Sequence, residues 1–404
     1  MNLPEETIHR SNIEHPRLYL SSHRPGRKPL RQTPNVDLAQ SYGDAVSTRN
    51  PEHIRILFQN VKGLTHSSTG EDYDYYLSCV SDLDADIVGM AETNTAWDHP
   101  YLRQAISSRL KRHYQMSRVS FSSPSHTVDP MPDTESYQAG GTATFTNRKM
   151  VPFSYGAVFQ DPTGLGRWNG LHFRGRNNTQ FTVLTGYRVC SGSINTASIG
   201  SAAAGREHEY LRIINGKTPS PRKAFLQDLS NTIKGFQEDG NLILDMLDSN
   251  GRLEDDAELQ QFLVENDLRD LHPAHPSPST YIGSDTRRID HMLGCPKVYS
   301  ALAASGSLSY LEGPQSDHRG LFVDLDPLQI LQTTTSQTIS TPNARLLKSG
   351  NPEHVEAYQT AMNDYYTEHS MMEGLTKSMK SRLSCPSPVS GDSLNNGMQT
   401  KVEP

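Results

Sequence analysis

An acidic and an amide side chain follow a short apolar run at residues 240–251 (Gly-Asn-Leu-Ile-Leu-Asp-Met-Leu-Asp-Ser-Asn-Gly). Turn-forming residues bound the run, which predicts a strand buried on both faces. Asp248 and Asn250 end it and face the same side if the chain stays extended, whereas Asp245 faces the opposite side and is predicted to be structural. A carboxylate beside an amide can hold and deprotonate a water molecule or bind a hard cation. The alternative is an Asx turn that closes the strand before Gly251.

Other polar residues lie at or near the ends of predicted strands: Asn60, Glu92, Tyr187, Asp290, Asp317 and His318. Each has a structural alternative. Asn60 and Asp317 could cap helices or turns, and Glu92 could be a solvated carboxylate. Asp290 could pair with Arg287 or Arg288, and His318 could lie exposed in a loop. Residues at one rim of a set of strands often form a site, so the whole group is of interest.

The eight polar residues taken together suit fewer kinds of reaction than each residue does alone. Several carboxylates with amides, and no cysteine ligands, suit a hard cation such as Mg²⁺ or Mn²⁺. One histidine and one tyrosine add a proton donor and a group that stabilises an anion. The set fits metal-assisted phosphodiester hydrolysis.

Alternating or continuous apolar runs predict the elements that must position these residues. We expect strands at residues 54–60, 86–92, 140–145, 151–159, 168–173, 181–189, 242–247, within 280–293 and at 321–325, and helices at 72–83, 102–110, 207–214, 222–236, 256–266 and 353–366. Residues 118–138 are predicted to be a surface loop and residues 191–205 a mobile loop. The four middle strands have no helices between them, which indicates an antiparallel region. The order favours an α/β (α+β) fold, with two packed sheets and helices outside.

Composition limits the broad class of the protein. Only 34% of the 404 residues are hydrophobic, so we expect a disordered arm at residues 1–50, a folded domain at 51–328, and a linker with a short helix and a disordered tail at 329–404. The net charge of −7 argues against a protein that coats nucleic acid. Four scattered cysteines fit a reduced intracellular protein, and no signal peptide or membrane span is expected.

The motifs, taken in order, resemble the endonuclease/exonuclease/phosphatase superfamily, which has the DNase I-like fold. They are Gln59-Asn-Val-Lys-Gly-Leu64, Glu92 after its strand, Tyr187, Asp248-Ser-Asn250, Arg288-Ile-Asp290 and Ser316-Asp-His318. Thr185-Gly-Tyr-Arg-Val-Cys190 and residues 221–229 are similar to the endonuclease domain of non-LTR (LINE-like) retrotransposon polyproteins. Residues 345–358 resemble the spacer before their reverse transcriptase. No polymerase follows, so a truncated copy or a derived host gene is expected.

The resemblance implies a four-layer sandwich of two mixed sheets and a divalent-metal-dependent DNA endonuclease that nicks one strand. It implies Asn60, Glu92 and Asp317 as metal residues, with Mg²⁺ or Mn²⁺ and no small-molecule cofactor. The implied catalytic residues are Tyr187, Asp248, Asn250, Asp290 and His318. Asp248 would deprotonate the water with help from Asn250, and Asp290 would orient His318. Asn60, Tyr187, Asn250 and His318 would contact the substrate phosphate.

Three positions depart from the repair-enzyme branch of the superfamily. Lys62 stands where apurinic endonucleases carry an acidic metal ligand, Cys190 where they carry Asn, and Leu247 precedes Asp248 where Gly is usual. These differences favour the retrotransposon branch.

Two alternatives to a nuclease stay open. They are a phosphoesterase acting on inositol phosphates, lipids or nucleotides, and an inactive relic that serves as a binding module. The cations of residues 103–112 and 167–176 either contact phosphates or are solvated faces. DNA is the expected partner, no membrane is expected, and a nuclear location follows if genomic DNA is the substrate. The sequence leaves the oligomeric state open.

Overall fold

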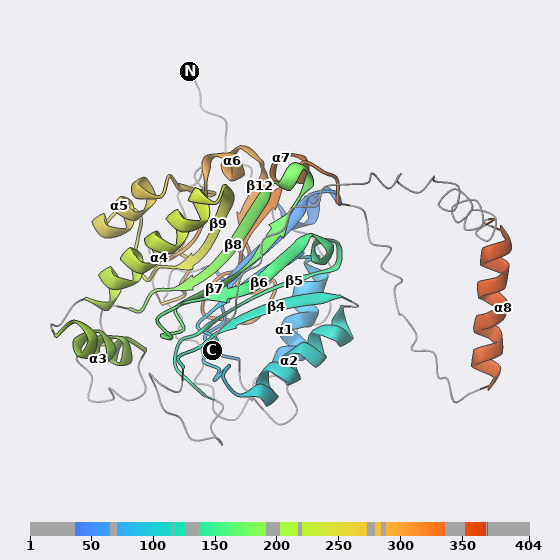
Figure 1. The fold of residues 1–404 in the computed structure, drawn as a ribbon, viewed down its shortest axis with the longest axis horizontal. Coiled ribbons are helices and arrows are strands. Elements are labelled where there is room, and N and C mark those ends of the chain that lie inside the picture. Colours follow the sequence, from blue (N-terminus) through green and yellow to red (C-terminus); the bar gives the residue numbers. More distant parts are fainter. Residues whose placement is uncertain are drawn as a thin grey trace, which may run out of the picture. The chain divides into compact units, whose positions relative to one another are not determined.

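The computed structural model describes residues 37–64, 71–114, 116–125, 137–190, 203–216, 220–272, 279–283, 288–335 and 352–368, together with residue 370. The chain divides into two compact units, residues 1–340 and 341–404. The first unit contains both sheets (Figure 1). The second contains α8 (Pro352–Glu368), which confirms the helix predicted at residues 353–366.

The first sheet has seven strands in the order β1-β12-β13-β2-β3-β5-β4. Their bounds in that order are Tyr42–Gly43, Leu302–Ser307, Leu321–Leu325, Ile54–Asn60, Ile87–Ala91, Thr142–Asn147 and Ser117–Ser122. Strands β2 and β3 are parallel, and the other neighbours are antiparallel. The sheet is therefore mixed.

The second sheet has six strands in the order β10-β11-β9-β8-β7-β6. Their bounds in that order are Arg269–Asp270, Asp290–Gly294, Asn241–Asp248, Gln180–Tyr187, Trp168–Arg174 and Ser154–Gln160. Here β8 and β9 form the parallel pair. The central strand β9 is buried along nearly its whole length, as its continuous apolar run predicts.

Helices cover the outer faces of the two sheets (Figure 1). Helices α1 (Glu71–Asp82) and α2 (Pro100–His113) share an apolar cluster with the first sheet, and α4 (Pro221–Glu238) and α5 (Ala257–Glu265) share one with the second. The remaining α-helices of this unit are α3 (Ala203–Asn215), α6 (Pro296–Ser300) and α7 (Pro327–Ile330), and short 3₁₀ segments lie at Val46–Thr48, Arg148–Phe153 and Arg176–Asn178. The expected four-layer α/β sandwich is confirmed.

Small and polar residues join the two sheets at the centre of the sandwich. Gly89 on β3 lies so close to the second sheet that a Cβ there would be 2.5 Å from Met246 Cε and 2.6 Å from Thr185 Oγ1. The Thr185 hydroxyl also hydrogen-bonds that of Thr144 on β5 across the interface, at 2.7 Å. The close contact fixes the separation of the two sheets at this point.

Several sequence expectations need correction. Residues 117–122, most of them predicted to lie in a surface loop, form β4, because Val119 and Phe121 pack against the apolar cluster of the first sheet. Strand β12 was not predicted, since its small residues have weak strand propensity and its place is set by pairing with β13. The predicted antiparallel region is divided between the two sheets.

Structure also begins before residue 51, since Tyr42 pairs with Ser307 and Arg49 forms an ion pair with Asp84. Of the predicted mobile loop at 191–205, residues 191–202 lie outside the described residues and 203–205 begin α3. No helix in the described ranges has the length and apolar character needed to cross a membrane.

Candidate active site

The polar residues singled out by the sequence gather at one edge of the sandwich. Asn60, Tyr187 and Asp248 end β2, β8 and β9, and Glu92 directly follows β3. Strands β11 and β13 run antiparallel to β9 and β2, so their starts lie at the same edge. Asp290 begins β11, and Asp317 and His318 precede β13. Strand direction thus brings residues from the whole first unit to one place.

Asn60 connects the two sheets within this site. Its Nδ2 donates to Glu92 Oε2 at 2.9 Å and to Asp248 Oδ2 at 2.7 Å. Its Oδ1 accepts from the backbone N–H of Lys62 at 2.8 Å. The side chain is buried with all three bonds made, so it holds one carboxylate from each sheet in a fixed position.

Asp248 also closes the turn that follows β9. Its Oδ1 accepts from the backbone N–H of Asn250 at 3.0 Å, and this is the Asx turn that the sequence left as an alternative. Asn250 has a φ of +47°, so the chain does not stay extended here and the same-side projection expected of an extended chain does not apply. The Asn250 Nδ2 instead donates to the backbone carbonyl of Arg188 at 2.8 Å. Asp248 therefore forms the turn with one oxygen and faces Asn60 with the other.

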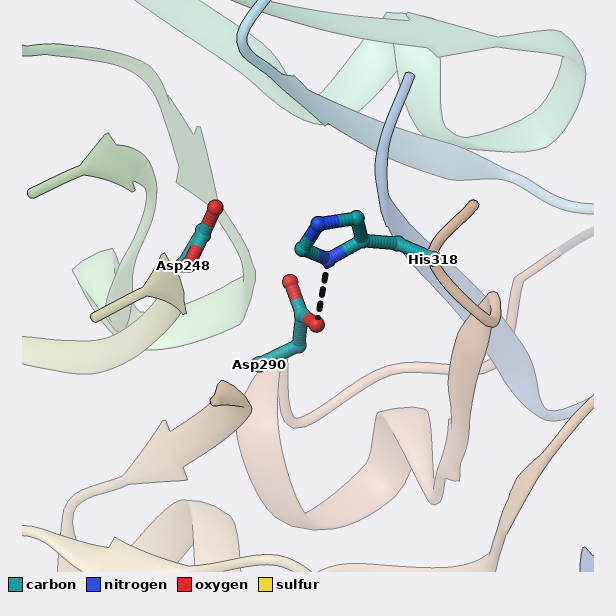
Figure 2. Close-up of side chains that lie close together, drawn as sticks. All are labelled: Asp248, Asp290 and His318. Atoms are coloured by element: carbon teal, nitrogen blue, oxygen red, sulfur yellow. Dashed lines mark hydrogen bonds and ion pairs between the residues drawn. The ribbon is translucent and has the colours of Figure 1, made fainter. Parts of the chain in front are cut away.

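Asp290 and His318 form a buried pair beside Asp248 (Figure 2). The His318 Nδ1 lies 2.8 Å from Asp290 Oδ2. Asp248 and Asp290 are directly opposite in the β9–β11 register, and one ligating atom each from Asp248, Asp290 and His318 lie within 4.8 Å of one another. Arg288 pairs with Asp270 instead, which excludes the Arg288–Asp290 salt bridge left open by the sequence. Arg287 lies outside the described residues.

The close approach of these groups shifts their pKa values. Burial and the charge of Asp290 raise the pKa of Asp248 to about 8, against the opposing effects of His318 and Asn60. Burial alone would lower the pKa of His318, but the charge and hydrogen bond of Asp290, with the charges of Asp248 and Asp317, raise it to about 10. His318 is therefore an imidazolium at neutral pH and can donate hydrogen bonds from both ring nitrogens.

Asp317 and Lys62 form an ion pair next to the His318 backbone. Lys62 and Glu92 both adopt left-handed backbone conformations, with φ of +47° and +51°, which non-glycine residues rarely do. Glu92 itself is half-buried, and Asn94 Nδ2 contacts its Oε1 at 3.4 Å. Strained residues on both loops indicate that the surrounding contacts impose their positions.

The donor set fits a divalent cation. Asp290 Oδ1 and Asp317 Oδ1 are buried and make no hydrogen bond with the described part of the chain. Most of the candidate donors are oxygens, as hard cations prefer. Buried carboxylate oxygens without a partner are costly unless something else binds them.

Tyr187 lies opposite Asp248 in the parallel β8–β9 register. Burial raises the pKa of its hydroxyl well above 10, and the charges of Glu92 and Asp248 add to this effect. The hydroxyl therefore stays protonated and can donate to an anion. All eight predicted site residues thus lie at this edge, although the Asn250 amide is directed to the Arg188 carbonyl.

Several supporting residues were given no role by sequence reasoning. Ser316 Oγ donates to the Asn60 carbonyl at 2.6 Å and accepts from the His318 N–H at 3.2 Å. Gln59 Nε2 donates to the His318 carbonyl at 3.0 Å, and the Thr280 hydroxyl accepts from the Asp290 N–H at 3.2 Å. The Tyr281 ring lies 5.2 Å from the His318 ring. Ser316 and Gln59 belong to the quoted motifs, but nothing in the sequence indicates their partners.

The cation-rich stretches have mostly internal partners. Arg167 is buried and bonded to Asp161 and Asp228, so it cannot contact a substrate phosphate. Arg109 and Arg112 both pair with Asp74.

No protein-family model matches this sequence, and comparison with curated proteins found no match. Among solved structures, one match is the endonuclease domain of TRAS1, a telomere-specific non-LTR retrotransposon (14% identity, 70% of this chain and 100% of that one, TM-score 0.43). Another is the human Nocturnin catalytic domain (14% identity, 69% and 98% covered, TM-score 0.44). A third is the AP endonuclease LMAP from Leishmania major (12% identity, 70% and 90% covered, TM-score 0.46). At these identities the role of each residue rests on the geometry of this chain.

Proposed function

We propose that this chain is a divalent-metal-dependent phosphodiester hydrolase, and specifically a DNA endonuclease that nicks one strand and derives from a non-LTR retrotransposon. The observation that carries the proposal is the Asn60 amide. It holds Glu92 and Asp248 from two different sheets, directly beside the Asp290–His318 pair. DNA as substrate and the retrotransposon origin rest on the motif resemblance.

Glu92, with Asn60 beside it and Asp317 as support, is the set proposed to hold Mg²⁺ or Mn²⁺. When bound, such an ion polarises the phosphoryl group and offsets negative charge that develops on it. Asn60, Glu92 and Asp317 are thereby assigned to metal binding. The remaining polar groups of the site are assigned to proton transfer and to hydrogen bonds with the substrate.

Asp248 is proposed to accept a proton from the attacking water. Asn60 and the Asn250 N–H fix its two oxygens, so its orientation does not depend on solvent. Asn250 acts in this scheme by holding the turn. The positive charges of His318 and of a bound metal ion favour the ionised form of Asp248 and so oppose the rise in its pKa.

His318 is proposed to donate a hydrogen bond to a nonbridging phosphate oxygen. Asp290 engages Nδ1, which leaves Nε2 to face the substrate and stabilises the imidazolium. Tyr187 stays protonated because of its raised pKa and is proposed to stabilise the leaving oxygen. General acid–base groups of this kind contribute roughly 10²–10⁴-fold to rate.

A supercoiled-plasmid nicking assay tests the proposal. We expect the full chain to produce open-circular DNA with Mg²⁺ and none with EDTA, and Asp248→Asn to lose roughly 10²-fold or more of the rate. Asp245→Asn is the matched control, since Asp245 is equally buried on the same strand but outside the site. Burial already raises the pKa of Asp245 to about 7, so a neutral amide is a close substitute.

Nicking by Asp248→Asn at the parental rate would contradict the roles assigned here. Turnover of an inositol phosphate without plasmid nicking would favour the phosphoesterase alternative. No turnover of either substrate by a folded chain would favour the inactive binding module.

A further inference from the structure

Lys62 brings a positive charge into the acidic edge of the sandwich. Its Nζ forms an ion pair with Asp317 Oδ2, and a lysine is charged at neutral pH. Asp317 is nearly buried, with 5% of its side chain exposed, whereas 57% of the Lys62 side chain is exposed. The ammonium thus neutralises a buried carboxylate from the open side of the site.

The backbone around Lys62 is fixed by the site itself. The Lys62 N–H donates to Asn60 Oδ1 at 2.8 Å, and the next N–H, of Gly63, donates to the Glu92 carbonyl at 2.7 Å. In this position Lys62 adopts a left-handed φ of +47°, which is strained for a non-glycine residue. Asn60 and Glu92, two of the three residues proposed to hold the metal, therefore fix the loop that places the ammonium on Asp317.

We propose that Lys62 is a resident cation of the active site. It occupies Asp317 Oδ2, so that this carboxylate supports a single divalent ion through Oδ1 alone, and it offers its remaining N–H groups to the substrate phosphate. The identity of the substrate rests on the proposed function, but the number of divalent ions that the site binds does not. An ammonium has three donors, and Asp317 uses one of them. A lysine binds phosphate as a point charge, which suits an exposed side chain.

Removal of the ammonium should change cation binding in a predictable direction. Without Lys62, Asp317 is a nearly buried carboxylate that has lost its ion-pair partner. A divalent ion then gains an attractive partner and loses a repulsive neighbour, and both changes strengthen its binding.

The test is titration of the purified full chain with Mn²⁺ alone, followed by electron paramagnetic resonance or calorimetry, for Lys62→Gln and the parent. We expect one bound Mn²⁺ in the parent and, in Lys62→Gln, either a second equivalent or an affinity at least about tenfold higher. Lys297→Gln is the control. Lys297 is exposed on α6, after the end of β11 that lies away from Asp290, and its loss should change neither quantity.

A second titration, with inorganic phosphate and one equivalent of bound Mn²⁺ per chain, addresses the substrate side. Lys62→Gln should bind phosphate at least about fivefold more weakly than the parent and Lys297→Gln. Unchanged Mn²⁺ stoichiometry and affinity in Lys62→Gln would overturn the proposal, as would unchanged phosphate affinity. Both titrations need no turnover, so a failure of the nicking assay does not decide this outcome.

Discussion

The Asp290–His318 pair shows how much of the site chemistry depends on single contacts. The pair is buried, and one hydrogen bond links the two side chains. Because burial disfavours the charged imidazole, the charge on His318 depends on its acidic neighbours, of which Asp290 has the largest effect. The raised pKa also stabilises the folded state. That contribution is complete below the ordinary histidine pKa of about 6.5 and is lost as pH rises through about 10.

Replacement of Asp290 by Asn should therefore lower the pKa of His318, so that its ring is no longer charged at neutral pH. In Asp290→Asn, burial remains and the main counter-charge is gone, so we expect the pKa of His318 to fall from about 10 to below about 7. An NMR titration of the His318 ring, assigned with a His318→Gln variant, measures the change. His53, outside the site, is the internal control. If the His318 ring still titrated near pH 10 in Asp290→Asn, Asp248 and Asp317 alone would be enough to keep the ring charged.

At the scale of elements, two arginines hold the turn after β9 that carries Asp248. Arg188 donates its N–H to the Asp248 carbonyl at 2.8 Å, and its own carbonyl accepts from Asn250. The guanidinium of Arg188 and that of Arg222 both bond Asp256 Oδ2, at 2.6 and 3.0 Å. Asp256 also caps α5 through its Oδ1. The start of α5 and the end of β8 are thus joined to the turn that carries Asp248.

Asp256→Asn should loosen this turn while keeping the helix cap. The amide oxygen can still accept from Leu259, but the charge that holds the two arginines is lost. We expect a loss of about 1–3 kcal/mol in the free energy of unfolding, measured with urea, and a nicking rate reduced about tenfold at a temperature where the variant is folded. Arg252→Gln, a surface change in the same turn region, is the control. Full activity of folded Asp256→Asn would contradict a role for the arginine contacts in positioning Asp248.

At the scale of the whole first unit, the site exists only because two sheets stack at a fixed distance. Asn60 belongs to the first sheet and Asp248 to the second, and the 2.7 Å bond between them crosses the sandwich. Gly89 lies in the same interface, where a side chain has no room. The spacing of the sheets and the geometry of the site are therefore linked.

Gly89→Ala should change the spacing of the two sheets and, with it, the geometry of the site. The added methyl would lie 2.5 Å from Met246 Cε and 2.6 Å from Thr185 Oγ1, so the sheets must shift or these two side chains must move. We expect a destabilisation of about 1–3 kcal/mol by calorimetry and a reduced nicking rate, because Asn60 and Asp248 move apart. Gly235→Ala is the matched control, since nothing lies within 4 Å of its added methyl and alanine favours the helix. A parental rate in Gly89→Ala would show that the Met246 and Thr185 side chains move instead of the sheets.

The residue types at the strand ends, and the positions of most of the strands and helices, follow from local patterns in the sequence. Burial and turn chemistry are local properties, so apolar periodicity marks β9 and the Asp248 turn without knowledge of the fold. The same local information places Asp245 and Asp248 on opposite sides of one strand. Strands without such a pattern, such as β12, were missed because pairing with a neighbour defines them.

Which side chains contact one another depends on the packing of the folded chain. The Asn60–Asp248 bond joins residues 188 positions apart, and the Lys62–Asp317 pair joins residues 255 positions apart. Such contacts depend on how two sheets stack and how loops at their edge are held, which no local pattern encodes. For the same reason the sequence left Asp290 between an arginine and a histidine partner. It also could not show that Asn250 turns towards Arg188, since the left-handed conformation at Asn250 is set by the contacts around it.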